Sequence, residues 1–241
     1  MGTDNGKSER ALDRIAAGVR HPAVEHVLNV VKALLANFPV GAAIASLMTD
    51  YIPKRQTQRL EEFAKRVAED IAGRQERVDA EFVKTDEFAY LFEECFRGVA
   101  RNYQQEKIEA FRGILVNSLI SREAGQAERE FFLGLVQTLT VLHIQIMRLM
   151  AQPERLQVPA PPRKGSQLKG LGASIEAVLP NVSGEAILAA FDDLVRRQLL
   201  VTDVLAFGGV PDFHILGKHN TRLSDLGRRF VDFCTVGDDR D

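Results

Sequence analysis

The chain has 241 residues, of which 45% are hydrophobic and 27% are charged. This composition is typical of a globular protein and excludes an intrinsically disordered chain. Basic residues number 31 and acidic residues 33, so no overall charge attracts the chain to nucleic acid or to an anionic membrane. The length allows one large domain or two small ones.

The cysteines and the opening residues bear on cellular location. Cys95 and Cys234 lie far apart among apolar neighbours, and we expect two reduced, buried thiols. Residues 1–22 begin with a polar stretch that lacks the apolar centre of a secretory signal, so we expect a flexible N-terminal segment. Both observations favour a cytoplasmic protein.

The next segment, residues 24–51, is unusually apolar, and residues 33–49 carry no charge. This uncharged stretch reaches the lower limit of the roughly 17 to 25 residues that span a bilayer, but Pro39 and Gly41 interrupt it. Two interpretations stay open: a buried helical hairpin inside a bundle, or a hairpin that inserts into a membrane. The candidate membrane residues are Leu34, Leu35, Phe38, Pro39, Ile44 and Leu47.

Two long helices are predicted between Pro53 and Ser121. In the first, apolar residues recur in near-heptad steps, and the charged residues between them form a solvent face. The second begins after the capping residue Thr85 and continues through Tyr103. Together with the helix that follows, they predict an antiparallel bundle over residues 23–151. The apolar surplus on these helices predicts a homo-oligomer.

Residues 128–151 are predicted to form a single amphipathic helix. Apolar side chains recur there at intervals of three and four, which places them on one helical face. Phe131 and Val141 widen this face, so we expect neighbours on more than one side. The bundle is expected to pack against the first half of this helix and a C-terminal module against the second half. The residues of the face are Phe132, Leu135, Leu139, Leu142, Ile146 and Leu149.

The pattern changes after this helix. Residues 152–172 contain four prolines and three glycines, which predicts a linker or an exposed loop. Residues 173–241 then predict a small α+β module, with a short helix before Pro180 and a helix over 184–198 that Ser183 caps. Its other predicted elements are a strand over 199–205, a loop over 207–212, a returning strand over 213–216 and a last helix capped by Ser224.

This order of elements resembles a winged-helix domain. In that family a final strand often leads into a Leu-Ser/Thr-x-x-Gly helix start, which Leu223, Ser224 and Gly227 match. Residues 138–150 would supply the first helix of the domain. The whole chain also resembles helical proteins of uncharacterised bacterial families that end in such a module, a resemblance that supplies no function. The predicted fold class is therefore mainly α: an antiparallel bundle of long helices followed by a small α+β winged-helix-like module.

The resemblance raises the question of DNA binding, because winged-helix proteins commonly place the helix that matches 184–198 in the major groove. Here that helix carries Glu185, Asp192 and Asp193, which repel phosphates, and the loop over 206–212 contains no lysine or arginine. The basic residues available for nucleic-acid or partner contact are Lys164, Lys169, Arg196, Arg197, Lys218, His219, Arg222, Arg228 and Arg229.

The leading expectation is therefore a non-enzymatic interaction or regulatory protein that associates with itself or with a protein partner. Two alternatives stay open. One is a DNA-binding transcriptional regulator, and the other is a membrane-associated effector that acts through residues 33–49.

Signals for catalysis are few. The five histidines show no metal-ligand spacing with cysteine or carboxylate residues, and His143 is expected to be semi-buried. Gly165 and Gly170 have the spacing of a phosphate loop, but Leu171 and Gly172 stand where that loop requires Lys and Ser or Thr. We expect no enzymatic activity, no metal and no cofactor.

Overall fold

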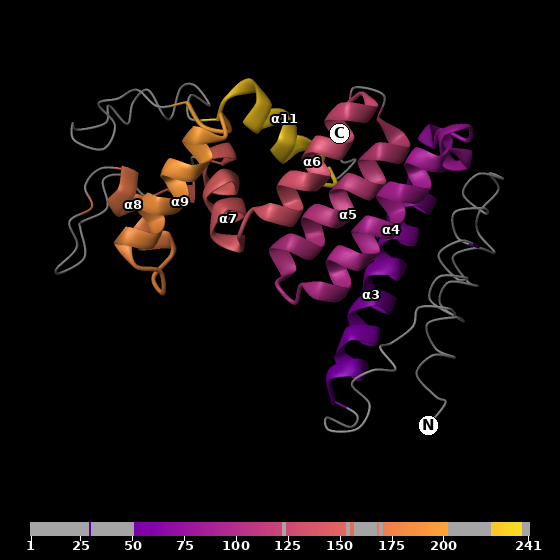
Figure 1. Cartoon of the computed structure of the whole chain (residues 1–241), viewed down its shortest axis with the longest axis horizontal. Coiled ribbons are helices and arrows are strands. Elements are labelled where there is room, and N and C mark those ends of the chain that lie inside the picture. Colours follow the sequence, from indigo (N-terminus) through magenta and orange to yellow (C-terminus); the bar gives the residue numbers. More distant parts are fainter. Residues whose placement is uncertain are drawn as a thin grey trace. The chain divides into compact units, whose positions relative to one another are not determined.

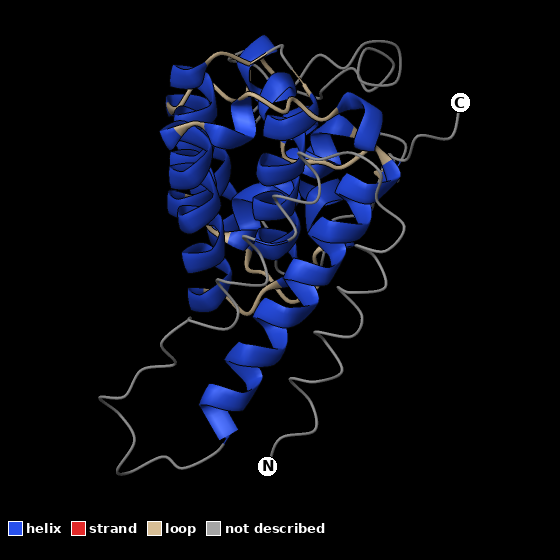
Figure 2. Ribbon diagram, turned by 90° about the vertical axis from the view of Figure 1, so that its right-hand side faces the viewer, coloured by secondary structure: helices blue, strands red, loops and turns tan. Residues whose placement is uncertain are grey.

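The computed structural model of the chain describes residues 29, 51–121, 124–152, 155–156, 168, 171–201 and 223–237. This described part contains eight α-helices and no strand (Figure 1, Figure 2), which confirms the prediction of a mainly α protein. The chain divides into two compact units. Unit 1 comprises Met1–Gln137 and Phe233–Asp241, and unit 2 comprises Thr138–Asp232. The apolar hairpin predicted at 33–49 lies outside the described residues.

Unit 1 is a helical bundle, as predicted. Its three longest helices, α3, α4 and α5, pack against one another and lie side by side in Figure 1. Two 3-10 turns separate α3 from α4 along the chain. The elements are α3 (Tyr51–Gly73), η1 (Gln75–Arg77), η2 (Phe82–Lys84), α4 (Asp86–Arg101), α5 (Gln105–Ile120) and α6 (Gln126–Thr138).

Phenylalanine side chains form much of the core of unit 1. Phe92 stacks on Phe96 with ring centroids 4.5 Å apart, and Phe63 packs edge-on against Phe96 at a centroid distance of 5.1 Å. Phe132 of α6 lies 5.5 Å from Phe233, and all five rings are buried. Each such ring removes about 150–250 Å² of surface from water, which makes this cluster a main source of the bundle's stability.

The two long helices predicted before Ser121 are shorter than expected. The first ends at Gly73 and is followed by the 3-10 turns. The second is divided at Asn102, whose backbone N–H and side-chain amide both donate to the carbonyl of Gly98, at 3.0 and 2.8 Å. The backbone of Asn102 is extended (φ −112°, ψ 138°), which ends α4, and its side-chain amide gives a carbonyl of the last turn a second donor. Tyr103, predicted on the apolar stripe, is 76% exposed.

The prediction of one helix over 128–151 is wrong. The structure forms two helices there, α6 and α7 (Val141–Ala151). Thr140 is the N-cap of α7 and forms a capping box with His143, so a new helix begins although the apolar spacing continues across the break. Phe131, expected to pack in the bundle, is 47% exposed.

Unit 2 is built around one central helix. Both α7 and α8 (Leu171–Val178) pack against α9 (Gly184–Arg196). As predicted, Ser183 caps α9, and its side-chain oxygen accepts the N–H of Ala186 at 3.2 Å. The apolar side chains buried in this unit include Ile146, Ile187, Phe191, Leu194 and Leu199.

The β-hairpin predicted in the module is not seen in the described residues. One isolated antiparallel bridge joins Leu200 to Leu223, and α11 (Asp225–Phe233) follows it. The chain between them, residues 202–222, lies outside the description and includes the predicted loop and returning strand. The described part of unit 2 is therefore helical, with the bridge as its one extended contact.

Among the described residues, none of the helices has by itself the length and apolar character needed to cross a bilayer. The pair α6 and α7 meets both criteria when the two helices are counted together across their break. Most of the side chains of this pair are buried or partly buried, as expected for core helices.

Candidate functional site

Four of the nine predicted contact residues are described. Arg196 is exposed on the last turn of α9, and Arg197 pairs with Asp193 at 2.8 Å. On α11, Arg228 pairs with Asp225 at 3.8 Å, and Arg229 is exposed. Each of these two ion pairs lies within one helix or its end and partly neutralises the arginine. The other five residues, Lys164, Lys169, Lys218, His219 and Arg222, lie outside the described residues.

The solvent-exposed side of α9 carries acidic side chains and a small one rather than basic side chains. Glu185, Ala189 and Asp192 are exposed, one turn after another along the helix. The hydrogen bond from Arg197 lowers the pKa of Asp193, so this carboxylate is also ionised at neutral pH. The exposed face of α9 from Glu185 to Asp193 therefore presents negative charge.

A polar cluster in unit 2 surrounds His143. The backbone N–H of Thr140 donates to His143 Nδ1 at 3.1 Å, and the hydroxyl of Thr140 lies 2.6 Å from the same nitrogen. Because Nδ1 accepts these bonds, the neutral ring carries its proton on Nε2. Nε2 is buried and lies 3.3 Å from the Asp193 carboxylate without hydrogen-bond geometry. We call Thr140, His143, Asp193 and Arg197 the histidine cluster.

The electrostatics of the histidine cluster favour a neutral imidazole. Burial lowers the pKa of His143 from its usual value, the charge of Asp193 acts in the opposite direction, and Arg197 adds to the lowering. The pKa of His143 is lowered overall, because burial destabilises the charged imidazolium more than the partly exposed Asp193 carboxylate stabilises it.

The order hydroxyl, imidazole, carboxylate is also that of a nucleophilic triad. In this chain, however, the contact between Thr140 and His143 is the capping contact of residues three apart at a helix start. The local geometry of α7 therefore accounts for it, and we assign the cluster a structural role. The sequence signal was Thr-x-x-His, in which His143 takes the place that Glu or Gln usually has in a capping box.

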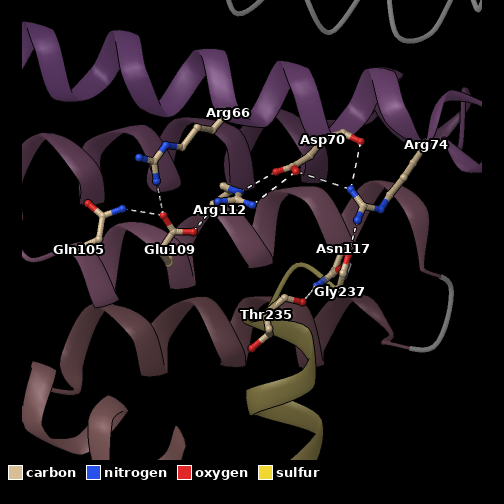
Figure 3. Close-up of polar contacts among 9 residues, drawn as sticks. All are labelled: Arg66, Asp70, Arg74, Gln105, Glu109, Arg112, Asn117, Thr235 and Gly237. Carbon is tan, nitrogen blue, oxygen red and sulfur yellow. Dashed lines mark hydrogen bonds and ion pairs between the residues drawn. The ribbon is translucent and has the colours of Figure 1, made fainter. Parts of the chain in front are cut away.

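A second set of charged residues joins α3 to α5 in unit 1 (Figure 3). Arg66 pairs with Glu109 at 2.7 Å, Glu109 with Arg112 at 2.5 Å, and Arg112 with Asp70 at 2.6 Å. Arg74 continues the series, with contacts to Asp70 and to a backbone carbonyl of the C-terminal segment. Glu62 also pairs with Arg66 at 2.6 Å, so the series has three arginines and three carboxylates, and their charges neutralise one another. This polar ladder holds helices together and leaves no charge for a ligand.

Lys107 is the one buried lysine among the described residues. Its Nζ donates to the carbonyl of Gln137 at 3.1 Å, and burial lowers its pKa. The side chain of Gln137 in turn donates to Glu94 at 2.9 Å. Two helices of unit 1, α5 and α4, thus hold the last turn of α6.

Metal and thiol chemistry have no visible site in the described part of the chain. No group of three or more histidine, cysteine, aspartate and glutamate side chains is placed there to hold a metal ion. Both cysteines are free and buried, and burial together with the charge of Glu94 raises the pKa of the Cys95 thiol. Cys95 is therefore a protonated, unreactive core residue.

No protein-family model, curated protein or solved structure matches this chain. The function is therefore inferred from the residues themselves. The features that bear on it are the acidic face of α9, the packing at the start of α11 and the break between α6 and α7.

Proposed function

We propose that the chain is a non-enzymatic interaction protein, in which the bundle of unit 1 is a scaffold and unit 2 is a winged-helix-like module that binds protein rather than DNA. The order of elements in unit 2 supports the module: α7, α8, α9, an antiparallel bridge and α11. The bridge between Leu200 and Leu223 brackets the segment where the hairpin is predicted.

The start of α11 gives the motif at 223–227 a physical role. Ser224 accepts the N–H of Gly227 at 2.9 Å and donates to the carbonyl of Gln198 at 2.6 Å. Its own N–H donates to the carbonyl of Leu199 at 3.1 Å. Gly227 approaches that same carbonyl so closely that a Cβ atom would overlap it. One serine thus caps α11 and ties it to the chain after α9, which supports the winged-helix interpretation.

The exposed face of α9 is the observation that favours a protein partner over DNA. A DNA reader needs donors or positive charge on this face, because phosphates surround the groove. Glu185 and Asp192 would instead repel phosphates, while Ala189 between them leaves room for a partner's side chain. A second copy of the chain is the partner to test first, since most soluble oligomers are homo-oligomers. It would meet this face with a different surface, because two copies of the acidic face repel each other.

The experiment combines sedimentation velocity with a DNA-binding assay. We expect the wild-type chain to self-associate and Ala189→Arg to weaken that association at least tenfold. Ala127→Arg is the matched control, because Ala127 is an exposed helical alanine of unit 1. Duplex DNA at low salt, where phosphate attraction is strongest, should show no binding. A monomeric wild type, equal effects of the two arginines, or tight DNA binding would each overturn the proposal.

A further inference from the structure

The break between α6 and α7 has no helix-breaking residue. Residues 137–141 read Gln-Thr-Leu-Thr-Val, without glycine or proline. Threonine and valine are only mildly unfavourable in helices, far less so than proline. The apolar spacing through Leu135, Leu139 and Leu142 also continues across the break. The local sequence is therefore compatible with one continuous helix, and side-chain contacts must account for the break.

Two side chains form hydrogen bonds with the backbone groups that would bond to each other's neighbours in a continuous helix. In an uninterrupted α-helix, the carbonyl of Gln137 would accept the N–H of Val141, four residues on. Here that carbonyl accepts Lys107 Nζ at 3.1 Å. The N–H of Thr140 would likewise donate within the helix, but it donates to His143 Nδ1 at 3.1 Å. Lys107 acts within unit 1 and His143 within unit 2.

We propose that the break is conditional: Lys107 and His143 hold it, and protonation of His143 releases it so that α6 and α7 join into one helix. This inference is independent of the proposed function. It makes residues 137–143 a proton-sensitive conformational switch.

The chemistry of the switch follows from the lone pair of Nδ1. Neutral His143 accepts the N–H of Thr140, whereas the imidazolium carries a proton on both nitrogens and has no acceptor. Protonation therefore sets the N–H of Thr140 against the N–H on Nδ1, and the backbone N–H loses its acceptor, while the Thr140 hydroxyl, 2.6 Å from Nδ1, changes from donor to acceptor. The charged groups around the ring come from α9 and its end: Asp193 favours the imidazolium, and Arg197 opposes it, while Arg196 acts on Asp193.

The direction of the pH dependence follows from these contacts. In the broken form, burial and, to a smaller extent, Arg197 lower the pKa of His143 against the opposing charge of Asp193, and the neutral ring that results is the one that accepts the N–H of Thr140. A continuous helix does not need Nδ1 as an acceptor, and its histidine binds a proton more readily. Acid therefore favours the continuous helix, beginning as the pH falls below about 6.5, the usual value for histidine.

The test measures the distance between two spin labels on the full chain, at Glu130→Cys on α6 and Arg148→Cys on α7. These positions are 18 residues apart, so one continuous helix places their backbones about 27 Å apart, and a bend at the break brings them closer. The buried Cys95 and Cys234 should stay unlabelled, which the parent chain verifies. Double electron–electron resonance then compares samples prepared at about pH 7.5 and about pH 5.

We expect the wild type to gain the long-distance population only in acid. His143→Gln is the matched control, because glutamine keeps the capping acceptor but does not titrate, and it should show the short distance at both pH values. His143→Ala and Lys107→Met should each raise the long population at neutral pH. Two results would overturn the proposal: no long population in the acid wild type, or an equal acid response in His143→Gln.

Discussion

Gly113 of α5 lies against the backbone carbonyl of Cys234, and a Cβ atom at Gly113 would overlap that carbonyl. The contact fixes the C-terminal segment to the bundle of unit 1. Asn117, one turn further along α5, reinforces it by donating to the carbonyls of Phe233 and Thr235 at 2.9 and 3.0 Å. An interior glycine, normally unfavourable in a helix, is thereby explained by close packing on a neighbouring backbone.

Gly113→Ala should consequently destabilise unit 1. The added methyl group meets a backbone carbonyl, which cannot turn aside as a side chain would, so we expect a loss of about 1–3 kcal/mol in the free energy of unfolding. Gly134→Ala on α6 is the control, since a Cβ there meets nothing within 4 Å and alanine favours the helix by about 1 kcal/mol. Urea denaturation measures both. Equal effects of the two substitutions would contradict the packing argument.

Arg129 and Glu87 supply a second prediction. The guanidinium donates to both carboxylate oxygens, at 2.6 and 3.1 Å, and to the carbonyl of Ala124, and it lies over the ring of Phe82. Both side chains are largely buried, 12% and 13% exposed. Arg129→Met should therefore cost about 3 kcal/mol, because it leaves Glu87 buried and unpaired.

A double-mutant cycle separates the pair from its surroundings. Adding Glu87→Gln to Arg129→Met removes the unpaired charge and should recover part of the loss, giving a coupling of about 1–2 kcal/mol. Additive effects in the cycle would show that Arg129 acts through the Phe82 ring and the Ala124 carbonyl alone.

The sequence predicted those parts of the fold that depend on local pattern. Apolar spacing located the helices of both units, and the caps Thr85 and Ser183 begin α4 and α9 as expected. The breaks were missed because each occurs at a residue with extended backbone inside a continuing apolar pattern, and each is accompanied by a side-chain contact: Asn102 with the carbonyl of Gly98, and His143 with the N–H of Thr140. The spacing of apolar residues does not indicate either contact.

The histidine cluster was missed for a different reason. His143 and Asp193 are 50 residues apart, and only the packing of α7 against α9 brings them within 3.3 Å. The exposure of Phe131 shows the same limit, because periodicity assigns a residue to a face without showing whether anything covers that face. Tertiary contacts decide both outcomes.

Ser224 supplies a third prediction, now for unit 2. Ser224→Ala removes the cap of α11 and the hydrogen bond to the carbonyl of Gln198, so it should lower the free energy of unfolding by about 1–2 kcal/mol. Ser224→Thr keeps the hydroxyl and should retain most of the stability. The measurement is thermal unfolding followed by circular dichroism. A threonine variant as unstable as the alanine variant would mean that the space around Ser224, rather than its hydrogen bonds, is what matters.

The two thiols make a prediction about reactivity. Cys95 and Cys234 are buried, and the raised pKa of Cys95 keeps its thiol protonated. A disulfide reagent at mildly alkaline pH should therefore react with neither cysteine in the folded chain and with both after denaturation in urea. A fast-reacting thiol in the native protein would show that one of the core positions opens to solvent.

The pH dependence of stability follows from the lowered pKa of His143. Burial makes the folded chain bind this proton less readily than the unfolded chain, whose histidine titrates near 6.5. The stabilisation is therefore fully present above about pH 6.5 and is lost as the pH falls from that value toward the lowered pKa.

Urea denaturation between about pH 5 and about pH 8 measures the loss, and His143→Gln, which does not titrate, removes the contributions of all other groups by difference. The wild type should lose stability relative to His143→Gln in acid. A difference that stays constant, or that favours the wild type in acid, would mean that Asp193 outweighs burial and raises the pKa.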